Sequence, residues 1–230
     1  MKNKNLSFAS KKGFTLAEVL IVLGIIGVVA ALTIPALLNK YNKDQIAVKL
    51  QRATSELNQA YKLATSQNGE LSTADMVNWE PVDIYNTYWK PYFKVSKFCN
   101  DFKSCGYKSN TPFITRQKTN TGTMIVPSAN FTFETTNGFT YFVQTRGNAT
   151  PPHIESFGLY FDINGSKGPN MLGTDIFIFS FAPNSTESIL PICSGRTDEE
   201  VNQNCKESDG GCCAEKIRRD GWKIGKDYPF

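Results

Sequence analysis

The sequence predicts an α+β protein in which a long N-terminal helix packs on a C-terminal antiparallel sheet. An apolar stretch follows a short basic segment at the N-terminus, and a helical repeat of apolar residues continues it. Beyond residue 130, short runs alternate apolar and polar side chains, as strands do, and turn residues separate them. We therefore expect a basic leader at residues 1–13, one helix in two parts at 14–38 and 39–69, and a globular head at 70–230 with a disulfide-rich C-terminal segment.

Residues 14–38 are apolar enough to cross a membrane. As a helix they reach about 37 Å, against a hydrocarbon core of about 30 Å. Glu18 is their one charged residue, and we expect no partner for it within its own helix. A central charge would cost about 2.5–3.5 kcal/mol, and one near an end costs less. A cut between Gly13 and Phe14 would place a new α-amino group one turn from this carboxylate, where it can neutralise Glu18 of the same or a neighbouring chain.

The segment Lys12-Gly13-Phe14-Thr15-Leu16-Ala17-Glu18, followed by an apolar helix with Pro35, resembles the start of known membrane proteins. It is similar to the leader and first helix of type IV prepilins and type II secretion pseudopilins. The resemblance implies that a membrane peptidase cuts after Gly13 and that Phe14 becomes N-methylated. It also implies that Glu18 is the charge partner in assembly, and that the helices bundle into a filament core.

The same resemblance implies three partners: a prepilin peptidase and methyltransferase, other pilin or pseudopilin subunits, and the cytoplasmic membrane. The leader contains four lysines and no acid, which predicts a cytoplasmic N-terminus, a single membrane pass and a head outside the cytoplasm, later in a filament at the cell surface. The whole chain has 25 basic and 21 acidic residues, so the cut chain is formally neutral. We therefore expect no nucleic-acid partner.

Two plainer interpretations of the N-terminus are an ordinary secretory signal and a simple membrane anchor. A secretory signal has an apolar region of 7–15 residues, shorter than the one here, and lacks an internal carboxylate. A simple anchor explains the length of the apolar stretch but not the residues around Gly13. Both remain alternatives to a prepilin.

The second part of the helix is amphipathic. Pro35 precedes it and should kink the helix, because proline cannot donate a hydrogen bond to the Ala31 carbonyl. Asn68-Gly69 is a typical helix end. One apolar stripe should cover the sheet of the head, and it consists of Ile46, Leu50, Ala53, Leu57, Ala60, Tyr61 and Ala64.

The head should contain short helices and loops around a first strand, followed by a run of strands. Aromatic residues between 70 and 128, Trp79 among them, should pack on the sheet. Asn137-Gly138 predicts a type I′ hairpin turn. The tail predicts a last strand or short helix that closes the domain with Trp222 and Tyr228. The four predicted strands are 131–134, 139–144, 157–163 and 175–181.

The six cysteines indicate an oxidising compartment and disulfide bonds. Six cysteines allow fifteen pairings. Cys99 and Cys105 can close a small loop, and the other four can form two bridges. A zinc site is the alternative, but paired C-x2-C spacing is missing and the chain has one histidine. The four cysteines near the C-terminus are Cys193, Cys205, Cys212 and Cys213.

The loop from Asp162 to Asp175 is the one stretch that resembles a ligand site. Its Asp and Asn side chains offer oxygen atoms, and several pseudopilins hold calcium near the end of their domain. An EF-type loop, however, needs glycine at its sixth position and glutamate at its twelfth, and this loop has neither. We favour turns that join two strands, and we expect no metal and no cofactor.

The sequence contains no recognisable group of catalytic residues. The single histidine, His153, follows two prolines, and neither a phosphate-binding glycine loop nor a nucleophile motif occurs. The sequence therefore predicts a structural filament subunit rather than an enzyme. A minor tip subunit that binds DNA, sugar or a secreted protein is the alternative, and a membrane-anchored enzyme is a third hypothesis.

Overall fold

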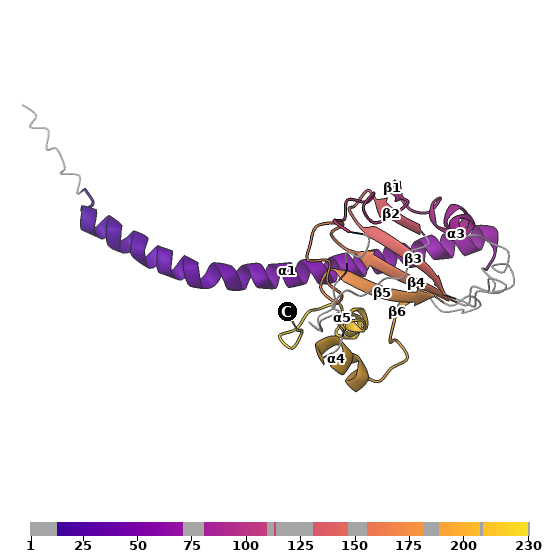
Figure 1. The fold of residues 1–230 in the computed structure, drawn as a ribbon. Helices are drawn as coiled ribbons and strands as arrows, with labels where there is room; N and C mark the ends of the chain where they lie inside the picture. Colours follow the sequence, from indigo (N-terminus) through magenta and orange to yellow (C-terminus); the bar gives the residue numbers. More distant parts are fainter. Residues whose placement is uncertain are drawn as a thin grey trace, which may run out of the picture. The chain divides into compact units, whose positions relative to one another are not determined.

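The computed structural model describes residues 13–70, 81–109, 113, 131–146, 156–181, 189–207 and 209–229 (Figure 1). The chain divides into two compact units, Met1–Asn42 and Lys43–Phe230. A long N-terminal helix is followed by a domain with a six-stranded antiparallel sheet, so the predicted α+β class is confirmed. The leader before Gly13, Trp79 and His153 lie outside the described residues.

Helix α1 (Leu16–Asn68) begins and ends close to where the sequence predicts. It ends at Gly69, which has a φ of 83° and donates its N–H to the Thr65 carbonyl at 2.9 Å. Only glycine adopts this left-handed conformation without strain, so the helix stops there. α1 continues as α-helix through Pro35. A kink at this proline stays a prediction.

The first unit contains the apolar part of α1. Its large side chains are exposed in the isolated chain, including Leu20, Ile25 and Leu32. Among the described residues, α1 is the one helix long and apolar enough to cross a membrane. Apolar side chains on every side of a helix need a lipid or protein environment.

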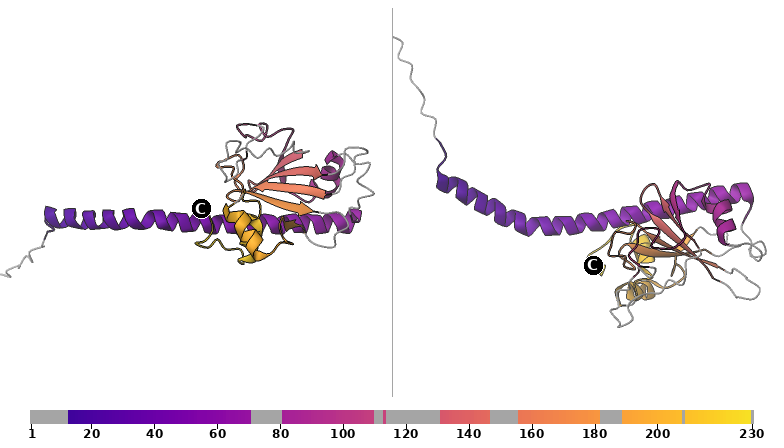
Figure 2. Two further views of the ribbon diagram at one scale, coloured as in Figure 1. Left: turned by 60° about the horizontal axis from the view of Figure 1, so that its bottom comes forward. Right: turned by 45° about the horizontal axis from the view of Figure 1, so that its top comes forward.

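In the second unit, the predicted stripe of α1 is confirmed. Leu50, Ala53 and Leu57 are fully buried, whereas Ile46 and Tyr61 are partly buried against the same core. Full burial of one leucine side chain contributes about 1.5–3 kcal/mol. The stripe covers one face of the sheet (Figure 2).

The six strands pair in sequence order, each antiparallel to the next. The four predicted strands correspond to β2–β5 and differ by two residues or fewer at each end. The strands are β1 (Val95–Cys99), β2 (Phe131–Thr135), β3 (Thr140–Arg146), β4 (Ser156–Asp162), β5 (Ile176–Phe181) and β6 (Leu190–Pro191).

The sheet is covered on both faces. Tyr141 and Phe161 point to the core shared with α1, whereas their neighbours Phe142 and Tyr160 belong to a second core on the opposite face. This second core explains why the strands contain consecutive apolar residues instead of strict alternation. Phe113 packs there on Phe142, with ring centroids 4.9 Å apart.

The predicted type I′ turn between β2 and β3 is wrong. Gly138 has a φ of 84°, but Asn137 lacks the positive φ that the first position of this turn requires. Instead, Gly138 N–H binds the Thr135 carbonyl at 2.9 Å, and Thr135 N–H binds the Phe139 carbonyl at 2.9 Å. This pattern fits a three-residue hairpin with glycine in the left-handed position.

The aromatic region forms a short helix, α3 (Pro81–Ile84), and one turn of π-helix, η1 (Tyr85–Trp89). The Tyr85 ring centroid lies 5.2 Å from that of Phe131 and 5.4 Å from that of Phe133. These contacts confirm for Tyr85 that the aromatic side chain packs on the sheet.

The C-terminal segment contains helices α4 (Asp198–Glu207) and α5 (Cys213–Arg219). α5 lies beside β6, and α4 packs on α5 (Figure 1). Disulfide bonds join Cys193 to Cys212 and Cys205 to Cys213. α5 is the predicted short helix of the tail, whereas α4 was not predicted. Tyr228 is buried and Trp222 is partly buried on the main core.

Candidate functional site

The N-terminal turn of α1 holds Glu18 by hydrogen bonds. The Glu18 carboxylate accepts the Thr15 backbone N–H at 2.8 Å and the Thr15 hydroxyl at 2.9 Å. In return, the Thr15 hydroxyl oxygen accepts the Glu18 backbone N–H at 3.2 Å. This reciprocal pair is a capping box, which satisfies two N–H groups that an α-helix leaves free at its start.

The prediction that Glu18 has no partner within its own helix is therefore wrong. Thr15 is that partner, although it carries no charge. The positive end of the helix dipole also favours a carboxylate in the first turn. The signal was present in the sequence, because Thr15-Leu-Ala-Glu18 has the T-x-x-E spacing of a capping box.

Gly13 and Phe14 precede the helix and are exposed. Phe14 is 90% exposed, and a side chain added at Gly13 would meet no atom within 4 Å. The fold therefore places no steric demand for glycine at position 13. If glycine is required there, the requirement belongs to a molecule that binds this segment.

The loop from Asp162 to Asp175 is a closed network of hydrogen bonds. Asp162 accepts the Tyr107 hydroxyl at 2.8 Å and the Asn164 backbone N–H at 2.9 Å. Asp175 accepts the backbone N–H of Asn170 at 2.9 Å and of Met171 at 2.6 Å. Burial raises the pKa of both aspartates, and the hydrogen bonds oppose this effect.

The carboxylate oxygens of this loop are held by hydrogen bonds within the protein. Calcium requires six to eight oxygen ligands, and all four carboxylate oxygens of Asp162 and Asp175 already accept hydrogen bonds from the loop and from Tyr107. The side-chain oxygens of Asn164 and Asn170 are buried without a described partner, and amide oxygens of this kind are among the ligands that calcium accepts. The backbone donors among these hydrogen bonds support turns that join the two strands, and the expected absence of a metal stays a prediction.

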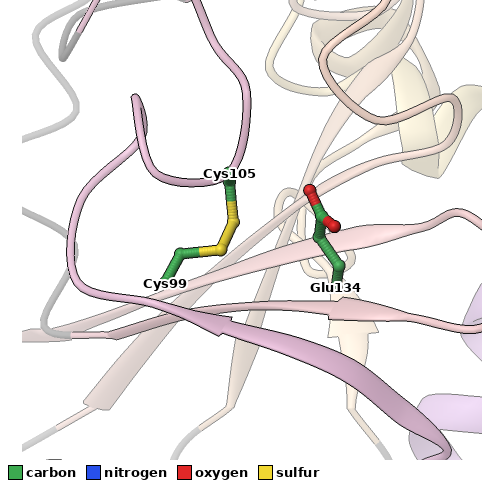
Figure 3. Close-up of side chains that lie close together, drawn as sticks. All are labelled: Cys99, Cys105 and Glu134. Carbon is green, nitrogen blue, oxygen red and sulfur yellow. A yellow bond between two sulfur atoms is a disulfide. The ribbon is translucent and has the colours of Figure 1, made fainter.

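A second candidate for a metal site lies at the end of β1. Figure 3 shows the Glu134 carboxylate beside Cys99 and Cys105. The possible ligand atoms of these three residues lie within 4.8 Å of one another. The two sulfur atoms form a disulfide bond. A bonded sulfur has no thiolate to offer a metal. All six cysteines are paired in the described structure, so the zinc alternative has no free thiol to use.

Comparison with known proteins identifies two family models. The prokaryotic N-terminal methylation motif matches residues 8–34, which include Gly13, Phe14 and Glu18. The model described as "Family of unknown function (DUF6613)" matches residues 36–230. No curated protein and no solved structure matches the chain.

The methylation motif marks subunits that are structural rather than enzymatic. Together with an apolar N-terminal helix, it is the arrangement of a protein anchored in the inner membrane. The predicted resemblance to prepilins and pseudopilins is thus confirmed. The chain belongs to the family of unknown function DUF6613, and its N-terminal motif makes it a protein of the type IV prepilin and pseudopilin type.

Proposed function

We propose that the protein is a structural subunit of a type IV pilus or a type II secretion pseudopilus. A prepilin peptidase cuts the chain after Gly13, the new N-terminal Phe14 is N-methylated, and residues 14–38 pack with other subunits in a filament. The observation that carries the proposal is the methylation motif at residues 8–34, joined to a helix able to cross a membrane.

Glu18 has two successive partners in this proposal. Before the cut, Thr15 holds its carboxylate at the helix start, which lowers the cost of a charge at the membrane. After the cut, the backbone nitrogen of Phe14 becomes a charged amine one turn away. Contact between apolar helices gains little inside a lipid bilayer. The carboxylate–amine pair therefore fixes the orientation and axial offset of neighbouring subunits.

The leader sets the topology. Its lysines keep the N-terminus in the cytoplasm, and the head folds outside, where its three disulfide bonds are stable. The head then travels with the filament to the cell surface. The alternative role as a tip-located binding module gains no support from a specific feature of the described residues.

Intact mass spectrometry of the chain purified from its native membrane tests the proposal. We expect a mature chain that begins at Phe14, carries one methyl group and has lost six hydrogens through its disulfide bonds. The leader should stay attached when Gly13→Leu blocks the cut. A wild-type chain that keeps its leader in cells with an active peptidase would contradict the proposal.

A further inference from the structure

A pocket in the second unit is not used by the proposed function. Its volume is about 320 Å³, and it lies between α1, the segment after η1 and the turn between β2 and β3. It is lined by Arg52, Glu56, Gln59, Ala60, Leu63, Tyr92, Phe93, Lys94, Thr135, Thr136 and Asn137.

Hydrogen bonds fix the polar wall of this pocket. Glu56 accepts the Arg52 Nε–H at 2.8 Å and the Asn137 side-chain N–H at 2.8 Å, so it joins α1 to the turn. Arg52 stays 61% exposed, and only its Nε binds a described residue. Its two terminal amino groups have no acceptor among the described residues, so they can donate hydrogen bonds to another molecule.

Behind the pocket lies a buried hydroxyl, on a residue that packs on the lining residue Phe93 but does not line the pocket itself. Phe93 lines the pocket, and its ring lies 5.2 Å from that of Tyr141. The Tyr141 hydroxyl is fully buried and has no described partner. Burial raises the pKa of Tyr141, the charge of Glu56 raises it further, and the charge of Arg52 lowers it.

The rim of the pocket combines positive charge with exposed apolar side chains. Lys94 is exposed, and its backbone carbonyl accepts the Thr136 N–H at 2.9 Å, which fixes its position. Val48 and Leu63 are 57% and 52% exposed on α1. Their spacing from Arg52 places all three on one side of the helix. Positive charge beside exposed apolar area favours an acidic protein segment as the occupant.

The chain itself carries such a segment. Asp198-Glu199-Glu200 is the only run of consecutive acids in the sequence, and it forms the exposed first turn of α4. Asp198 pairs with Arg219 at 2.5 Å, and Glu200 caps Thr197 at 2.8 Å. Glu199 is exposed and makes no hydrogen bond or ion pair with another described residue, so its charge is available to another molecule.

The two surfaces lie toward different edges of the sheet. The pocket adjoins the end of β2 and the segment before β1, whereas α4 follows β6, the strand at the other edge (Figure 1). We infer that the pocket of one subunit binds the acidic first turn of α4 of a second copy, with Lys94 and Arg52 facing Glu199. Such a contact is heterologous and repeats without closing. The inference rests on the proposed filament and supplies the contact that sets the register of its heads.

Site-specific photo-cross-linking in the full-length chain tests this contact. A benzoylphenylalanine at Gln59, which lines the pocket, should link two copies within filaments, and the linked peptide should contain residues 198–207. Lys94→Glu should lower the yield at least fivefold, and so should Glu199→Lys. The double variant should restore at least half of the wild-type yield, whereas the control Lys167→Glu should change nothing.

A cross-link to another segment or another protein would overturn the inference, and so would a double variant without recovery. If filaments still form in either case, only the inferred contact is wrong and the proposed function is not contradicted. If the wild-type chain keeps its leader and never enters a filament, the proposed function itself fails. The two failures are therefore distinguishable in one set of strains.

Discussion

Two Thr–Glu pairs begin two helices in the same way. Thr197 and Glu200 form a capping box at the start of α4, with the Glu200 carboxylate 2.8 Å from the Thr197 backbone nitrogen. Thr15 and Glu18 repeat this geometry at the start of α1. At α4 the box stabilises a short polar helix, whereas at α1 it holds a carboxylate beside the site of the proposed cut. The same local structure thus serves different purposes.

The buried aspartates predict a pH-dependent stability. Burial raises the pKa of Asp162 well above 3.8, and the nearby charge of Asp175 raises it further. The folded chain therefore binds this proton more tightly than the unfolded chain. The stabilising contribution is complete below pH 3.8 and is lost as the pH rises through the higher folded pKa. Asp162 therefore stabilises the folded chain most at acidic pH.

Replacing Asp162 by Asn should remove this dependence. We expect the Tm of Asp162→Asn, relative to wild type, to rise progressively as the pH increases above 3.8. Thermal unfolding of the detergent-solubilised chain at a series of pH values measures the effect. Asp44→Asn, at an exposed acid, is the control and should follow the wild type. A Tm difference that is the same at every pH would contradict the assignment.

At the scale of elements, periodicity predicted most of the fold. The stripe on α1 and strands β2–β5 followed from apolar spacing, because burial on one side or on both leaves a clear pattern. Helix α4 has only two buried residues, Val201 and Cys205, so its periodicity was too weak to detect. The hairpin turn was mispredicted because Asn-Gly suits more than one turn type, and the surrounding backbone decides between them.

The candidate site was partly predictable as well. Gly13, Phe14 and Glu18 belong to one contiguous sequence motif, and they lie together at the start of α1. The capping role of Thr15 was not predicted, because only a charged partner was expected for Glu18 and the Thr15 hydroxyl carries no charge. The pocket beside Arg52 combines α1, residues 92–94 and residues 135–137, and no sequence pattern brings such distant segments together.

Two leucines on α1 provide a matched test of the stripe. Leu57 is fully buried, whereas Leu63 is 52% exposed. Leu57→Ala should lower the free energy of unfolding by about 2–5 kcal/mol, because it removes buried apolar area and leaves a cavity. Leu63→Ala should change it by less than about 0.5 kcal/mol. Urea denaturation measures both values, and equal losses for the two variants would contradict the packing.

The hydrogen bonds of the loop between β4 and β5 predict that adding or removing calcium leaves the Tm unchanged. Its carboxylates are satisfied by hydrogen bonds from the protein. EDTA, and calcium in millimolar excess, should therefore shift the Tm by less than about 1 °C, since a ligand stabilises a fold only by binding it. Thermal unfolding in both buffers measures this. A calcium-dependent rise in Tm that Asp175→Asn abolishes would show that the loop binds the ion.

At the scale of the whole molecule, the two units differ in what surrounds their apolar side chains. The first exposes an apolar helix that requires a membrane or other subunits, whereas the second has a core on each face of its sheet. Arg218 and Arg219 hold the buried Glu215 at 2.7 and 2.6 Å. Although burial alone would raise the pKa of Glu215, these hydrogen bonds lower it, so it stays charged. Ion pairs and disulfides together secure the C-terminal segment.

The central claim is that Glu18 directs assembly rather than membrane insertion. The most direct measurement compares Glu18→Leu with wild type for membrane content, leader removal and recovery in sheared filaments. Thr15→Val is the control that removes the hydroxyl of the capping box and keeps the carboxylate. We expect Glu18→Leu to insert normally but to fall at least tenfold in filaments. Recovery of Glu18→Leu in filaments at the wild-type level would contradict the account.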